Sequence, residues 1–197
     1  MDAPADYSAA VRALTRNLPA YISYTIHSFV HVGVDHEQTD QVVVRTSDGK
    51  IVKGKRPTIN VGTGDRAKSG SVHDVPFDPK CYTATGAHTV QFEGSAAEEI
   101  DLRPTCRDRG DTEADAKTSG DFTKLYVDPV SYSPLAAIGE GTDKTVAVHL
   151  EQRFTNASGH VVPASFRVEI KGSGFMFWLN ILVREEFSRF GFSNSPP

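Results

Sequence analysis

The sequence has no long apolar run, and this absence removes membrane-spanning helices from consideration. Its longest uncharged apolar stretch, about twelve residues from Gly172 to Val183, is interrupted by Ser173 and Asn180. A helix that crosses a bilayer needs roughly twenty apolar residues. The 197 residues include only two cysteines, two methionines and one tryptophan. Neither a scaffold with many disulfides nor a cysteine-based metal finger is therefore expected.

Basic residues are also too few for a nucleic-acid-binding face. Lysine and arginine together number 21, against 25 aspartates and glutamates, and the formal net charge is −4. Nucleic-acid-binding domains concentrate positive charge on one face, so we expect no nucleic-acid partner. A chain of this length holds one ordinary domain. We therefore expect a single domain over residues 1–197.

Recognisable catalytic and cofactor motifs are missing as well. There is no Gly-x-Ser-x-Gly turn. The stretch 62–67 has the spacing of a dinucleotide-binding loop, but Pro76 and the lack of alternating strands and helices argue against the helix that such a loop opens. His27 and His31 stand about 13 Å apart on a strand, too far to share a zinc ion. We expect no catalytic residue, no cofactor and no metal.

What is present is a pattern of one helix and many strands. Tyr7, Val11, Leu14 and Leu18 recur at helical spacing, which predicts an amphipathic helix over 6–18 that ends before Pro19. Alternating apolar and polar residues after it predict about eight to ten antiparallel strands. The fold class is α+β, mainly antiparallel β. The predicted strands are 20–34, 41–46, 51–53, 122–128, 132–138, 144–155, 160–171 and 175–187, with turns at 47–50, 156–159 and 172–174 and a loop-rich segment at about 62–120.

The strand predicted at 175–187 is apolar on both faces near its middle. An antiparallel strand that is covered on one side alternates apolar with polar residues, so this pattern predicts cover on both sides. One short helix cannot supply both covers. The second cover is a further layer of sheet, the 62–120 segment, a partner protein or an apolar ligand, and a sandwich or barrel filled by its own side chains stays open as an alternative. Glu185 and Glu186 point to opposite faces and are expected to be solvated.

The two cysteines, Cys81 and Cys106, stand 25 positions apart across the turn-rich segment. One disulfide would constrain that segment in an oxidising compartment, and two unrelated buried thiols are the alternative. The opening residues Met1 to Asp6 are small and rich in alanine and proline. They are typical of a mature chain from which a signal peptide has been removed, and we expect a periplasmic or secreted protein.

Several of these segments, in this order, resemble the periplasmic outer-membrane lipoprotein carriers and lipoprotein-sorting (LolA-like) family. The similar segments are the helix, the long strand after it, the 47–50 turn, Leu125–Pro129 followed by Pro134 and Leu135, the turn and strand start at 159–163, and the final three strands. The resemblance implies an N-terminal helix packed on a curved sheet that forms an incomplete barrel. It also implies an apolar cavity for acyl chains and no enzymatic step. The family holds further helices as a lid, and the 62–120 segment here predicts only a short turn near 95–99.

The leading hypothesis is a periplasmic binding protein that shelters a lipid or a lipoprotein acyl chain without chemistry. The residues expected to form the cavity wall are Tyr24, Phe154, Phe175, Phe177, Trp178 and Leu179. The alternative is an envelope interaction module, a subunit that docks on a membrane-associated protein in a larger assembly.

Overall fold

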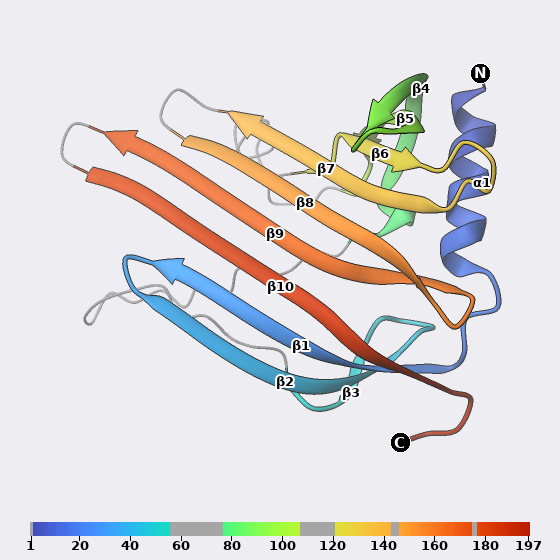
Figure 1. The fold of residues 1–197 in the computed structure, drawn as a ribbon, viewed down its shortest axis with the longest axis horizontal. Helices are drawn as coiled ribbons and strands as arrows, with labels where there is room; N and C mark the ends of the chain where they lie inside the picture. Colours follow the sequence, from blue (N-terminus) through green and yellow to red (C-terminus); the bar gives the residue numbers. More distant parts are fainter. Residues whose placement is uncertain (1, 56–76, 107–120, 143–145, 175–176) are drawn as a thin grey trace.

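Figure 1 shows the computed structural model of the chain, one helix standing across the ends of long, curved strands. The structure describes residues 2–55, 77–106, 121–142, 146–174 and 177–197. Within these residues no helix is long and apolar enough to cross a membrane. The 62–67 stretch with the dinucleotide-loop spacing lies outside the described residues.

The helix α1 spans Ala3–Thr15, three residues earlier than the pattern predicted. It begins early because Asp2 caps it and its carboxylate accepts a hydrogen bond from the Ala5 amide at 3.4 Å. It ends before Leu18 because Asn17 has a φ of 52°, which a right-handed helix does not allow. Tyr7 and Ala10 are its buried residues.

The described strands form one ten-stranded sheet in the order β3-β2-β1-β10-β9-β8-β7-β6-β5-β4, and every pairing is antiparallel. β3 and β4 are its outermost strands, and among the described residues the sheet does not close. The expected mainly antiparallel fold and incomplete barrel are confirmed. The strands are β1 (Tyr21–Val32), β2 (Asp35–Arg45), β3 (Ile51–Lys53), β4 (Tyr82–Phe92), β5 (Ser95–Pro104), β6 (Lys124–Val127), β7 (Pro134–Thr142), β8 (Val146–Ala157), β9 (His160–Gly174) and β10 (Phe177–Ser193).

The segment expected to be rich in loops contains a regular hairpin, so that expectation was wrong for its described part. β4 and β5 pair over their whole length, and β5 replaces the short turn predicted near 95–99. Glu93 and Gly94, with φ of 51° and 83°, form the two-residue turn between them. Small residues and charges in both strands hid this hairpin from the apolar pattern.

The hairpin of β9 and β10 also differs from the prediction. The expected turn at 172–174 belongs to β9, where Gly174 pairs with Phe177, and the connecting residues 175–176 lie outside the described ones. β10 continues beyond 187 to Ser193 because it pairs there with the start of β1. This long strand therefore joins the first and last parts of the chain in one sheet.

The core lies on the inner face of the sheet, which α1 covers at one end. α1 contacts β4, β5, β7 and β9. Figure 1 shows α1 beside β4, β5 and β6 at one end of the sheet. The other end, formed by β1 to β3 and β10, extends beyond the helix. The inner face is consequently covered unevenly along the order of strands.

Candidate functional site

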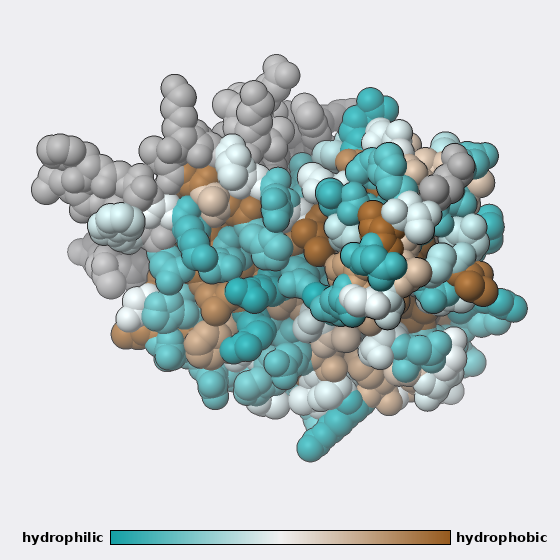
Figure 2. Space-filling view, turned by 45° about the horizontal axis from the view of Figure 1, so that its top comes forward, coloured by the Kyte–Doolittle hydropathy of each residue, from teal (hydrophilic) through white to brown (hydrophobic). Residues whose placement is uncertain are grey.

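A hollow lies on the inner face, between the C-terminal end of α1 and the strands of both halves of the sheet. It consists of two adjoining pockets of about 660 Å³ and 290 Å³. Thr15 on α1, Tyr24 on β1, Val44 on β2 and Gln152 on β8 line both of them. Figure 2 shows that hydrophobic residues reach the surface of the molecule in separate patches among hydrophilic ones.

Aromatic rings form much of the wall of this hollow. Tyr24 meets the Phe187 ring edge-on, with centroids 5.5 Å apart, and lies 6.0 Å from the Phe190 ring. Phe77 and Phe154 also line the hollow, with ring centroids 6.3 Å apart. Rings provide large, rigid apolar surface, so the wall suits an apolar guest.

Polar and charged side chains share the lining of the hollow with apolar ones, and two of them are deeply buried. Gln152 is 3% exposed, and its side-chain oxygen accepts a hydrogen bond from the Phe77 amide at 2.8 Å. Glu185 is also 3% exposed, and it accepts a hydrogen bond from the Ser28 hydroxyl at 3.3 Å. The expectation that Glu185 is solvated was therefore wrong. Glu185 shares the inward face of β10 with Ile181 and Val183, and of the two glutamates only Glu186 is exposed.

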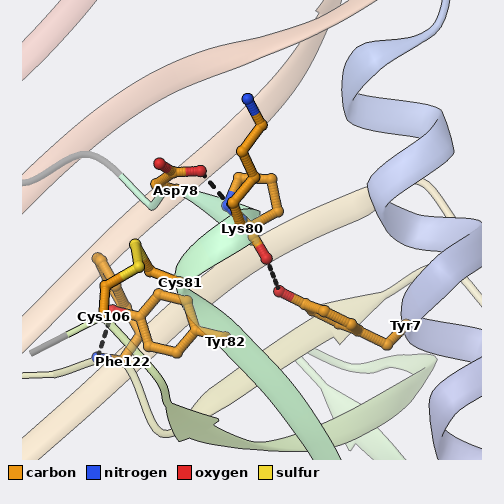
Figure 3. Close-up of a disulfide and its surroundings, with 8 residues drawn as sticks. Tyr7, Asp78, Lys80, Cys81, Tyr82, Cys106 and Phe122 are labelled. Atoms are coloured by element: carbon orange, nitrogen blue, oxygen red, sulfur yellow. Dashed lines mark hydrogen bonds between the residues drawn. A yellow bond between two sulfur atoms is a disulfide. The ribbon is translucent and has the colours of Figure 1, made fainter.

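Phe77 is followed in the chain by the disulfide region shown in Figure 3. Cys81 and Cys106 are bonded, with Cα atoms 4.7 Å apart, so the expected disulfide is present. Cys81 ends the short helix η1 (Pro79–Cys81), and the Tyr7 hydroxyl on α1 donates to the Pro79 carbonyl at 2.7 Å. Burial raises the pKa of the Tyr7 hydroxyl, which keeps it protonated and able to donate. η1 is thereby tied both to α1 and to the end of β5.

The residues expected to form the cavity wall are brought together only in part. Tyr24 and Phe154 line the hollow. Phe177 and Leu179 belong to β10, but the structure describes only their backbone. Phe175 lies outside the described residues. Trp178 is 90% exposed and shares the outer face of β10 with Asn180 and Arg184, so in the structure it is not a wall residue.

The prediction that β10 is covered on both faces was wrong for its described side chains. Ile181, Val183 and Glu185 are buried, whereas Asn180, Arg184 and Glu186 are exposed. The apolar even positions stop at Leu182, and the strand then alternates in the ordinary way of a sheet with one solvated face. Among the described side chains, this part of β10 therefore contributes apolar surface mainly to the inner face.

Other wall residues carried weaker sequence signals. Val44 and Phe187 lie in segments that the sequence predicted as strands. The face of the sheet on which their side chains lie depends on the register between strands. Phe77 follows Pro76 in the turn-rich segment, where no periodicity marks it as buried. In the structure Phe77 stacks on Tyr82, and its amide donates a hydrogen bond to Gln152. The residues of the hollow not expected from the sequence include Val44, Phe77, Pro163, Phe166, Phe187 and Phe190.

Comparison with known proteins gives similarity at the level of structure. No protein-family model and no curated protein matches the sequence. A domain from Vibrio parahaemolyticus named for outer membrane lipoprotein sorting is 11% identical, with a TM-score of 0.53 over 100% of this chain and 95% of that one. A LolA superfamily protein from Nitrosomonas europaea is 13% identical, with a TM-score of 0.49 over 100% of this chain and 96% of that one.

A DUF1329 family protein from Desulfovibrio piger is 9% identical, with a TM-score of 0.46 over 95% of this chain and 92% of that one. The Vibrio structure carries the comparison because its TM-score exceeds 0.5, and at 11% identity it concerns the fold alone. The chain shares the fold of the Vibrio lipoprotein-sorting domain, and in this chain that fold is one helix against an open antiparallel sheet. The resemblance expected from the sequence is confirmed for the fold.

Proposed function

We propose that the protein is a periplasmic binding protein that shelters an apolar ligand, a lipid or a lipoprotein acyl chain, in the hollow between α1 and the sheet. It holds the ligand by burying apolar surface and makes or breaks no bond. The proposal depends on one observation, the aromatic hollow on the inner face of a LolA-like fold. The Vibrio domain that shares this fold is named for lipoprotein sorting.

The size and lining of the hollow support this function. Ligand pockets have volumes of roughly 300–1,000 Å³ and are lined mainly by apolar and aromatic side chains with a few placed polar groups. The larger pocket, at about 660 Å³, lies within that range. Burial of each CH₂ group contributes about 0.8 kcal/mol, so a long acyl chain gains enough to offset its ordering.

Filling the hollow tests the proposal directly. Val44 lines both pockets, and Val44→Trp places an indole where the guest would lie. We expect at least a tenfold loss of affinity for a fluorescent fatty acyl probe, measured by titration. The matched control is Val34→Trp, because Val34 is 61% exposed and lines neither pocket. Equal affinity in both variants and the unchanged protein would place the lipid elsewhere.

The alternative, an envelope interaction module, predicts a different result in native mass spectrometry after gentle purification. A binding protein carries lipid masses that detergent removes and that Val44→Trp reduces. A module appears without lipid, in a complex of defined stoichiometry. The second result would overturn the lipid-binding proposal.

A further inference from the structure

Two carboxyl groups meet where α1 packs on β5, and neither lines the hollow. Asp6 lies in the first turn of α1, and Glu98 on β5 is 6% exposed and shares a hydrogen bond with it. One oxygen of each, Oδ2 of Asp6 and Oε1 of Glu98, is buried without an amide, hydroxyl or basic donor from the described residues. The two side chains are therefore part of the contact between the helix and the sheet.

The hydrogen bond between these two groups needs a proton on one of them. Ionised carboxylates only accept hydrogen bonds, and two of them at one site repel each other. Glu98 is the more deeply buried of the two, and burial together with Asp6 raises the pKa of its carboxyl group. Glu98 therefore donates to Asp6 while it is protonated, and this bond is lost as pH rises through the raised pKa.

The other groups around the pair do not replace this proton. The Tyr132 hydroxyl, in the turn between β6 and β7, also hydrogen-bonds to Asp6, whose charge raises the pKa of that hydroxyl and keeps it neutral. The positive charge of the amino terminus lowers the pKa of Glu98, but it contributes least to the shift. The residues directly across from Glu98 on the neighbouring strands, Thr89 on β4 and Val127 on β6, carry no charge.

The helix that carries Asp6 also forms part of the wall of the hollow. Thr15, at the other end of α1, lines both pockets. The Tyr7 hydroxyl, next to Asp6 in the chain, donates to the carbonyl of Pro79, which is another wall residue. Ionisation of Glu98 places two like charges between α1 and β5, which favours a state in which α1 packs less firmly. A guest that contacts α1 is then bound more weakly.

We propose that the Asp6–Glu98 pair is a pH-sensitive switch: the shared proton holds α1 on the sheet and the guest in the hollow, and its loss at higher pH weakens both contacts. This inference rests on the proposed function and adds the regulation of the same site. Lower pH favours the bound guest, and higher pH favours its release.

Hydrogen exchange tests the helix contact without any ligand. Comparison of the α1 amides between the unchanged protein and Glu98→Gln at one pH removes the intrinsic effect of pH on exchange. We expect α1 to exchange at least about threefold faster in the unchanged protein at pH 8, and at nearly the same rate in both at pH 5, because glutamine stays a neutral donor at both pH values. The matched control, Glu99→Gln, removes the same charge from the neighbouring position on the opposite face of β5 and is expected to follow the unchanged protein.

Titration with N-phenyl-1-naphthylamine, an apolar fluorescent probe that stays neutral from pH 5 to pH 8, measures retention of a guest. We expect the unchanged protein to bind this probe at least about threefold more weakly at pH 8 than at pH 5, since apparent affinity scales with the fraction of molecules in the binding state. Glu98→Gln is expected to bind it equally at both pH values. Asp6→Asn removes the charge from the helix side, is expected to give the same result, and serves if Glu98→Gln does not fold.

Probe binding that does not change with pH in the unchanged protein overturns the inference and leaves the proposed function intact. The same pH dependence in Glu98→Gln as in the unchanged protein also overturns it, since another group then titrates. Exchange of α1 that depends on Glu98 without a change in affinity overturns it as well, because the pair then stabilises the helix alone. Absence of binding at every pH overturns the proposed function, and the inference with it.

Discussion

Two adjacent glutamates on β5 show how one position along a strand reverses the effect of an acid on stability. Glu98 is 6% exposed and faces α1, and burial together with the neighbouring Asp6 raises the pKa of its carboxyl group. For Glu99 burial acts in the same direction, but the Lys124 ammonium, which donates to it at 2.7 Å, lowers the pKa of that carboxyl group overall. The two side chains point to opposite faces of the strand.

These shifts predict opposite pH dependences of stability. A raised pKa means that the folded state binds the proton more tightly, so the contribution of Glu98 is fully present below its unfolded pKa and is lost as pH rises through the raised value. Glu98→Gln should therefore raise Tm by a few degrees at pH 7, and the gain over the unchanged protein should shrink at pH 4. Glu99→Gln should lower Tm at pH 7 and have less effect as pH falls through the lowered pKa of Glu99. Thermal melts at both pH values check this, and shifts of one sign for both variants would contradict it.

At the scale of the elements, the short helix η1 depends on its covalent and hydrogen-bonded ties to keep Phe77 in the wall. Phe77 is 6% exposed and stacks on Tyr82, with ring centroids 5.2 Å apart. Cys81 ends η1, and its disulfide to Cys106 closes a loop of 25 positions. A crosslink of that span stabilises a fold by about 3 kcal/mol in the chain-entropy account.

Replacing both cysteines by alanine should therefore lower the free energy of unfolding by about 3 kcal/mol and weaken binding of the acyl probe, because Phe77 loses its fixed position. Tyr7→Phe removes only the hydrogen bond to Pro79 and should cost about 1 kcal/mol. Denaturant unfolding and probe titration measure both effects. An unchanged affinity in the doubly substituted protein would show that the wall does not need the disulfide.

At the scale of the whole molecule, the sheet separates an inner face that carries the hollow from an outer face that contacts solvent. The single tryptophan, Trp178, lies on the outer face and is 90% exposed. Its fluorescence should have the red-shifted maximum of an indole in water and be quenched readily by acrylamide. Addition of the acyl ligand should leave both properties unchanged. A blue shift on ligand addition would mean that the guest, or a rearranged strand, covers the outer face.

Several features could be predicted from the sequence because they depend on local spacing. The helix, the final antiparallel strands and the turn before β3 follow from periodicity and from turn residues close to one another in the chain. The disulfide could be predicted because only two cysteines are present. The β4–β5 hairpin was missed because its strands carry small and charged residues. Its place in the sheet is set by the pairing of β5 with β6.

The sequence by itself determined the composition of each strand. The face of the sheet on which each side chain lies depends on the register between strands, which only the tertiary structure decided. A shift of one residue moves a whole set of side chains to the opposite face. Tyr24 therefore reaches the hollow while Trp178 does not, and Glu185 is buried while Glu186 is solvated. The hollow itself is a tertiary property, because its walls come from α1 and from β1, β2, β8, β9 and β10. The pairing of β1 with β10 joins the strands from the start of the chain to those from its end.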